Sequence, residues 1–309
     1  MGWELYALLR AIGSAGHSIS LKSVLNNKEN SLIAVPLFVV LVPGILYTII
    51  ATSLGQYETI DQNENFYLGL FGNVTCNALN YLLNVWIIRR FDISYVESMK
   101  TVLPVFAGIF GSLILQEYLS LEVWLCIIVI VIGCFLLEYS RKVLDPKADN
   151  QVSKWGRLKS LIQSSGWFFM IPWLCLNALA TVFSKMVVVN GNIELYLGWR
   201  YLILSLFFLS VGYIYFKLKQ KTVTGFIKSF FTKNNAKATY SGIFLALIVA
   251  AEMRALQLAD IALVETLSKG SLFLILFAEI IFLKKALNWL RILSGSIILL
   301  GVMIFFYLT

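Results

Sequence analysis

The sequence predicts an all-α polytopic membrane protein, with ten transmembrane helices arranged as two inverted five-helix repeats. Three observations predict this fold class. The chain of 309 residues is 59% hydrophobic and only 14% charged, which is far from the composition of an ordinary soluble domain. Its apolar runs reach about 20 residues, which as a helix is enough to cross roughly 30 Å of hydrocarbon. A short sequence segment from the first half of the chain is also repeated, with substitutions, in the second half.

Hydropathy places the ten spans in order along the chain. They cover approximately residues 3–23, 32–54, 66–88, 93–115, 119–140, 166–189, 193–216, 239–258, 262–283 and 288–308. The first five spans form a half over 1–145, and the last five form a half over 166–309. A basic cytoplasmic linker at 146–165 is expected between them, and the lysine-rich residues 217–237 are expected to form a loop.

The repeated segment marks matched positions in the two halves. Residues 92–99 read Asp-Ile-Ser-Tyr-Val-Glu-Ser-Met, and residues 260–267 read Asp-Ile-Ala-Leu-Val-Glu-Thr-Leu. The offset of 168 residues also carries Gly133 onto Gly301. Because each half has an odd number of spans, the second half is predicted to enter the membrane upside down, and such internal repeats are typical of transporters.

Basic residues in the loops predict the orientation. The loops after odd-numbered spans carry the lysines and arginines, whereas the loops after even-numbered spans carry none. The positive-inside rule then places the odd loops in the cytoplasm and both termini outside. The chain is therefore predicted to be a multi-pass protein of the cell inner membrane, and an organelle membrane would produce the same pattern.

Several function classes find no support in the sequence. The four cysteines lie in apolar runs without CxxC spacing and His17 is the only histidine, so neither a metal site nor a cofactor is expected. The net charge of +8 is attributed to the loops, since no recognition motif indicates nucleic acid. An intramembrane enzyme would need a convergent nucleophile and base, so no enzyme is predicted.

Six spans (one, three, four, six, eight and nine) carry polar faces that lipid cannot solvate, and these faces are expected to line a shared interior. The candidate substrate-binding residues on them are Lys100, Lys269, Arg254, Lys185, Asn73, Asn77, Asn80, Asn84, His17, Ser14 and Asn177. The candidate proton carriers are Glu97, Glu265 and Glu252. Arg200 in span seven is expected instead to snorkel or to pair structurally. Pro104 is expected to let span four bend near mid-membrane.

A structural role for the same residues remains open. Asparagine and serine side chains also join packed membrane helices, and each such hydrogen bond contributes about 0.6–2 kcal/mol. Glu265 and Lys269 are four residues apart and Glu97 and Lys100 are three apart, so each pair can neutralise itself on its own helix.

The fourth span carries a resemblance to a known family. Residues 93–106 read Ile-Ser-Tyr-Val-Glu-Ser-Met-Lys-Thr-Val-Leu-Pro-Val-Phe, with a lysine ahead of a proline-phenylalanine stretch. This segment is similar to the corresponding helix of the triose-phosphate and nucleotide-sugar branch of the drug/metabolite transporter superfamily. The ten-span layout resembles the EamA-type members of that superfamily over nearly the whole chain. The resemblance implies that Lys100 and Lys269 contact a substrate phosphate, although Gly270 stands where the phosphate translocators have the arginine of a Lys-Arg pair.

These features predict a secondary-active transporter of a small polar, anionic metabolite that works by alternating access. Export is the direction expected by analogy alone. Three alternatives remain open: a proton-coupled exporter of neutral or amphiphilic compounds such as amino acids or drugs, a nucleotide-sugar or sugar-phosphate antiporter, and a scaffold or receptor that transports nothing. The substrate, the coupling ion and the direction are not determined by the sequence. The expected partners are a small-molecule substrate and the lipid bilayer, and a homodimer is left open.

Overall fold

The computed structural model describes residues 2–26, 31–56, 64–91, 96, 99–143, 166–218, 223–268, 293–298, 300–301 and 304. Every regular element in these ranges is a helix, with no strand among them. Four helical segments there are long and apolar enough to cross a membrane: Ala34–Ser53, Phe169–Val189, Ile193–Leu218 and Lys233–Leu258. The all-α class is therefore confirmed, whereas the ten spans and the inverted repeat stay predictions.

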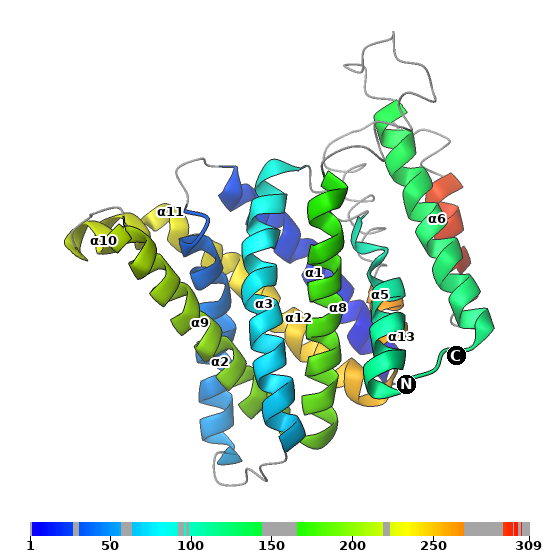
Figure 1. Ribbon diagram of the computed structural model, residues 1–309, viewed down its shortest axis with the longest axis horizontal. Helices are drawn as coiled ribbons and strands as arrows, with labels where there is room; N and C mark the ends of the chain where they lie inside the picture. The colour runs from blue at the N-terminus through cyan, green and yellow to red at the C-terminus, as the bar shows by residue number, and fades with distance from the viewer. Residues whose placement is uncertain are drawn as a thin grey trace.

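The helices form one bundle with a smaller group at its side (Figure 1). In chain order they are α1 Trp3–Leu25, α2 Ala34–Ser53, α3 Glu64–Arg90, α5 Leu103–Phe110, the π-helical η2 Gly111–Leu115, α6 Leu121–Val143, α8 Gly166–Asn190, α9 Ile193–Leu218, α10 Val223–Phe230, α11 Lys233–Ala236, α12 Ala238–Leu258 and α13 Ile261–Ser268. Helix α6 lies beside the short helical stretch that starts at residue 293, at the edge of the bundle (Figure 1). The predicted linker 146–165, Glu97 and Lys269 lie outside the described residues.

Three helix pairs make the centre of the bundle: α1 packs on α12, α2 on α9, and α3 on α8. Small residues allow the backbones of these pairs to approach closely. A Cβ atom added to Gly16 of α1 would lie 2.5 Å from Cε1 of Phe244 in α12. One added to Gly69 of α3 would lie 2.9 Å from the carbonyl oxygen of Phe183 in α8. Larger side chains at either glycine would push the paired helices apart.

The helix pairing maps onto itself under the 168-residue offset. A shift of 168 residues places α1 on α8, α2 on α9 and α3 on α12. The α1–α12 pair therefore corresponds to the α8–α3 pair, and the α2–α9 pair corresponds to itself. The same exchange occurs at the side of the bundle. A Cβ on Gly133 would meet Cγ1 of Ile298 at 2.8 Å, and a Cβ on Gly301 would meet Cγ1 of Ile130 at 2.7 Å. Ile130 and Ile298 are themselves 168 residues apart.

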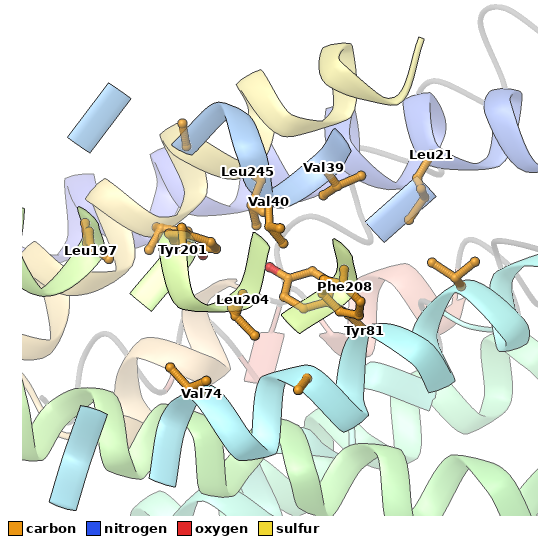
Figure 2. Packing of buried hydrophobic residues seen from close by; sticks show 14 of the residues in the cluster. Leu21, Val39, Val40, Val74, Tyr81, Leu197, Tyr201, Leu204, Phe208 and Leu245 are labelled. Carbon is orange, nitrogen blue, oxygen red and sulfur yellow. The ribbon is translucent and has the colours of Figure 1, made fainter. Parts of the chain in front are cut away.

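The apolar core lies where α9 meets α2 and α3. Leu197, Tyr201, Leu204 and Phe208 recur on one face of α9 at helical spacing and are fully buried. Figure 2 shows these side chains in the packed interior, where the ring of Phe208 meets Tyr81 of α3 edge-on with centroids 6.2 Å apart. This packing holds α9 against the first half of the chain.

The fourth predicted span is interrupted near Pro104. Residues 99–100 are helical, residues 101–102 form a turn and α5 begins at Leu103, so Pro104 lies in the first turn of a helix, where its missing N–H leaves no hydrogen bond unmade. This break agrees with the expectation that the segment bends there. The stretch 217–237, expected to be a loop, contains α10 and α11. Phe226 and Phe230 of α10 are buried against Phe216 of α9, which explains why a lysine-rich connection is helical there.

Candidate functional site

A cavity of about 150 Å³ lies in the middle of the bundle. It opens between α1, α3, α8, α9, α12 and α13, with residues 100–103 on a further side. A space of this size accommodates a small molecule. Its walls carry charged and amide side chains that are otherwise rare in membrane interiors.

Most of the predicted site residues that the structure describes meet in this cavity. Those that line it are Ser14, His17, Asn77, Asn80, Asn84, Lys100, Asn177, Glu252 and Glu265. The 3.6-residue periodicity of α1, α3 and α8 brought these side chains to the inner faces, as the polar stripes predicted. Asn73, Lys185 and Arg254 are placed elsewhere, and each has a clear set of protein partners.

Arg10 of α1 organises the acidic side of the cavity. Its Nη2 atom lies 2.6 Å from Oε1 of Glu265 and 3.3 Å from Oε1 of Glu252, and its Nη1 atom donates to Oγ of Ser268. Glu265 has no exposed surface and also accepts a hydrogen bond from Oγ1 of Thr181. One guanidinium therefore contacts two carboxylates and joins α1 to α12 and α13.

The basic side of the cavity contains Lys100. Its Nζ atom lies 5.7 Å from the ring centroid of Trp173 and 3.5 Å from Oγ of Ser18. The ring of Trp173 offers a cation–π contact to the ammonium group of Lys100. Lys100 is thus positioned to attract an acceptor group that enters the cavity.

The asparagine stripe of α3 divides into two roles. Asn80 and Asn177 exchange amide hydrogen bonds of 2.8 and 3.0 Å between α3 and α8. Asn73 is fully buried and does not line the cavity, and its Nδ2 atom donates to the Ala180 carbonyl and to Ser184 Oγ. Asn73 therefore joins helices, as the structural interpretation of the stripe expected, while Asn84 faces the cavity.

His17 also has a structural partner. Its Nδ1 atom lies 2.8 Å from Oγ of Ser241 and 3.1 Å from the Ser241 carbonyl oxygen, which ties α1 to α12. Among the described residues, no group of three or more His, Cys, Asp and Glu side chains is arranged to hold a metal ion.

Lys185 and Arg254 form ion pairs away from the cavity. Lys185 pairs with Glu117, reaches Asp260 at 3.6 Å, and donates to the Ala259 carbonyl at 2.8 Å. Arg254 has 45% of its side chain exposed and donates to Oε1 of Glu194 at 2.7 Å. Helical periodicity explains why Arg254 lies outside the cavity. Residues two apart on a helix do not share a face, and Glu252 takes the inward position on α12.

Arg200 of α9 lines the cavity, although the sequence predicted that it would snorkel or pair structurally. Only 5% of it is exposed, and its guanidinium carbon lies 4.8 Å from the ring centroid of Tyr201 and 5.9 Å from that of Tyr196. Both tyrosines are close to Arg200 in the sequence. An arginine flanked by aromatic residues within an apolar helix is therefore the sequence signal that could have indicated a buried Arg200. This buried side chain does not snorkel to a membrane surface.

The model of the triose-phosphate transporter family matches residues 12–140. This match supports a member of the drug/metabolite transporter superfamily. Members of the matched family are transporters, and the matched range contains α3 and Lys100. Together with the apolar helices, the match supports an integral membrane protein.

The fold is similar to that of a solved structure described only as a crystal structure of a protein. The TM-score is 0.70 at 10% sequence identity, and the alignment covers 99% of this chain and 97% of the other. At this identity the likeness concerns the fold alone. No curated protein matches the chain.

Proposed function

We propose that the protein is a secondary-active transporter that moves a small polar, anionic metabolite across a membrane by alternating access. The family match supports the transporter class and favours a sugar phosphate or a nucleotide sugar as the kind of substrate. Both termini outside a cell inner membrane is the orientation that we propose from the loop charges. Export is the direction that we propose by analogy with other transporters of this kind.

The observation that carries this proposal is the charge balance of the cavity wall. Arg10, Lys100 and Arg200 line it together with Glu252 and Glu265, which gives a net charge of +1 when His17 is neutral. Arg10 contacts both glutamates, whereas no ion pair to Arg200 occurs in the described part of the chain. A cation that is buried at membrane depth is costly unless an anion approaches it, so the cavity favours an anionic substrate.

Ten spans in two inverted halves are part of the proposal. The exchange of helix pairs and the reciprocal contacts of Gly133 and Gly301 support this arrangement. In such folds the substrate binds near the interface of the two halves, and the halves rock about it. The cavity has this location, because both halves contribute to its wall.

Proton coupling is a second element of the mechanism that one observation favours. Glu252 has 13% of its side chain exposed and contacts Arg10 at 3.3 Å, whereas Glu265 has no exposed side chain and contacts it at 2.6 Å. The looser and more accessible carboxylate is better placed to exchange a proton with the cavity. We therefore propose Glu252 in preference to Glu265 as the proton carrier.

A ligand screen tests the proposed function. Purified protein in detergent is heated with amino acids, inorganic phosphate, sugar phosphates, nucleotide sugars and neutral drugs, for the wild type and for Lys100→Ala. A ligand that binds the folded state raises the melting temperature by mass action. We expect an anionic metabolite to stabilise the wild type and to lose most of its effect in Lys100→Ala. Replacement of the exposed Lys228 of α10 by alanine should leave the effect as in the wild type. Stabilisation by neutral compounds alone would contradict the proposal.

A further inference from the structure

We propose that Arg200 forms an oxyanion subsite, at which a carboxylate or phosphate group of the substrate binds directly to the guanidinium. The inference rests on the proposed transport function and adds a specificity determinant to its cavity. It starts from a local feature of α9 and not from the fourth-span lysine.

Two of the donor nitrogens of Arg200 have no acceptor among the described residues. Its Nε and Nη1 atoms are buried and lack a hydrogen-bond partner among the described residues. No ion pair to Arg200 occurs within the described ranges either, and its close neighbours are the rings of Tyr196 and Tyr201. A ring face attracts a cation but does not accept the directed N–H donors of a guanidinium edge. The group therefore retains hydrogen-bonding capacity that a ligand can satisfy.

The same cavity concentrates the other unsatisfied polar atoms. Five buried side-chain atoms of residues that line the cavity lack a hydrogen-bond partner among the described residues. Besides the two Arg200 atoms they are Trp173 Nε1, Tyr201 Oη and Asn84 Oδ1. Buried polar groups in proteins are almost always hydrogen-bonded, so such a cluster points to a ligand-binding surface.

The types of these atoms indicate the chemistry of the ligand. Arg200 and Trp173 can only donate, and the Tyr201 hydroxyl can donate as well. A guanidinium binds carboxylate and phosphate oxygens in a planar, two-pronged arrangement that a lysine cannot reproduce. Asn84 Oδ1 adds one acceptor that suits a hydroxyl group. The ligand that fits is therefore an oxyanion with a hydroxylated body.

A purely structural role for Arg200 makes different predictions. If the cation–π contacts only held α9 in place, removing the charge would lower stability and leave anion affinity in the folded protein unchanged. If Arg200 binds the substrate, affinity falls while the folded state persists. Arg254 supplies the matched control, because it is an arginine of α12 that lies outside the cavity and pairs with Glu194.

The experiment measures binding of inorganic phosphate, glycerol 3-phosphate, glycerate and glycerol by calorimetry in lipid nanodiscs. The proteins are the wild type, Arg200→Met, Arg200→Lys, Lys100→Ala and Arg254→Met. We expect Arg200→Met to lower the affinity for the phosphorylated or the carboxylated probe by at least tenfold. Arg200→Lys should lose less affinity than Arg200→Met but should not reach the wild-type level. Glycerol affinity and the Arg254→Met protein should stay at the wild-type level. The probe that loses most affinity decides between phosphate and carboxylate.

The outcomes separate this inference from the proposed function. If the wild type binds an anion and Lys100→Ala weakens it, but a folded Arg200→Met does not, the subsite is overturned and the transporter proposal stands. If the wild type binds none of the anions, the proposed function fails first. If Arg200→Met does not fold, Arg200→Lys decides, since it keeps the charge: wild-type affinity for every anion would then overturn the subsite.

Discussion

Arg10 Nη2 and Glu265 Oε1 lie 2.6 Å apart, deep between α1 and α13. Arg10 comes from the first helix of the chain, whereas Glu265 belongs to the second copy of the repeated segment. The contact therefore joins the two halves at the wall of the cavity. Glu252 of α12 completes the cluster at 3.3 Å from the same nitrogen.

Breaking this cluster from one side should be strongly destabilising. Arg10→Met leaves Glu265 fully buried without its cation, and the loss of one partner of a buried ion pair costs about 3–5 kcal/mol. The expected result is a lower free energy of unfolding, measured by denaturation in mixed micelles. Arg10→Met combined with Glu265→Gln should recover part of the loss. Equal stability of Arg10→Met and the wild type would show that the cluster is solvated.

Asn73 and Asn84 should behave differently although they lie on one stripe. Asn73→Ala removes hydrogen bonds between α3 and α8, which contribute about 1–2 kcal/mol in model membrane helices, and should leave ligand affinity intact. Asn84→Ala should reduce affinity with little change in melting temperature, because Asn84 lines the cavity and its Oδ1 atom has no hydrogen-bond partner among the described residues. Thermal stability and ligand affinity are measured on both variants. The reverse pattern would invalidate this division of the stripe.

Glu252 should make transport depend on protons. In proteoliposomes with an imposed pH gradient, we expect Glu252→Gln to abolish the effect of the gradient while substrate exchange at equal pH continues. Glu265→Gln should instead lower stability, since Glu265 is the shorter partner of Arg10. Flux through Glu252→Gln that still responds to the gradient would exclude this residue as the carrier.

The ion pairs of Lys185 should keep one end of the protein closed. Lys185 of α8 contacts Glu117 after η2 and Asp260 before α13, and Glu117 also accepts a hydrogen bond from the Ile261 amide. Lys185→Met removes these links, so the population open at this end should rise. A single cysteine at position 184, in a variant without native cysteines, should then react several-fold faster with a membrane-impermeant maleimide. An unchanged rate would mean that apolar packing closes this end without Lys185.

Local patterns were sufficient to predict the all-α class and the lining of the cavity. Apolar runs predict membrane helices because the lipid requires every backbone group to be bonded within its own helix. The stripes of α1 and α3 predicted Ser14, His17 and Asn84 as inward-facing residues because helical periodicity is a property of the chain itself. Glu252 and Glu265 were found in the same way.

Only the tertiary structure decided which charges face one another. Arg10 could not be matched with Glu265 from the sequence, because 255 residues separate them and their contact depends on how α1 and α13 pack. Arg200 and Arg254 both read as arginines of apolar helices, yet one is enclosed by tyrosines and the other is half exposed. Burial is a property of the assembled bundle, and it determines whether a charge binds a ligand, pairs with a neighbour or reaches water. The sequence by itself determined that this protein is a helical membrane protein with polar inner faces, and packing decided which of its polar residues form the site.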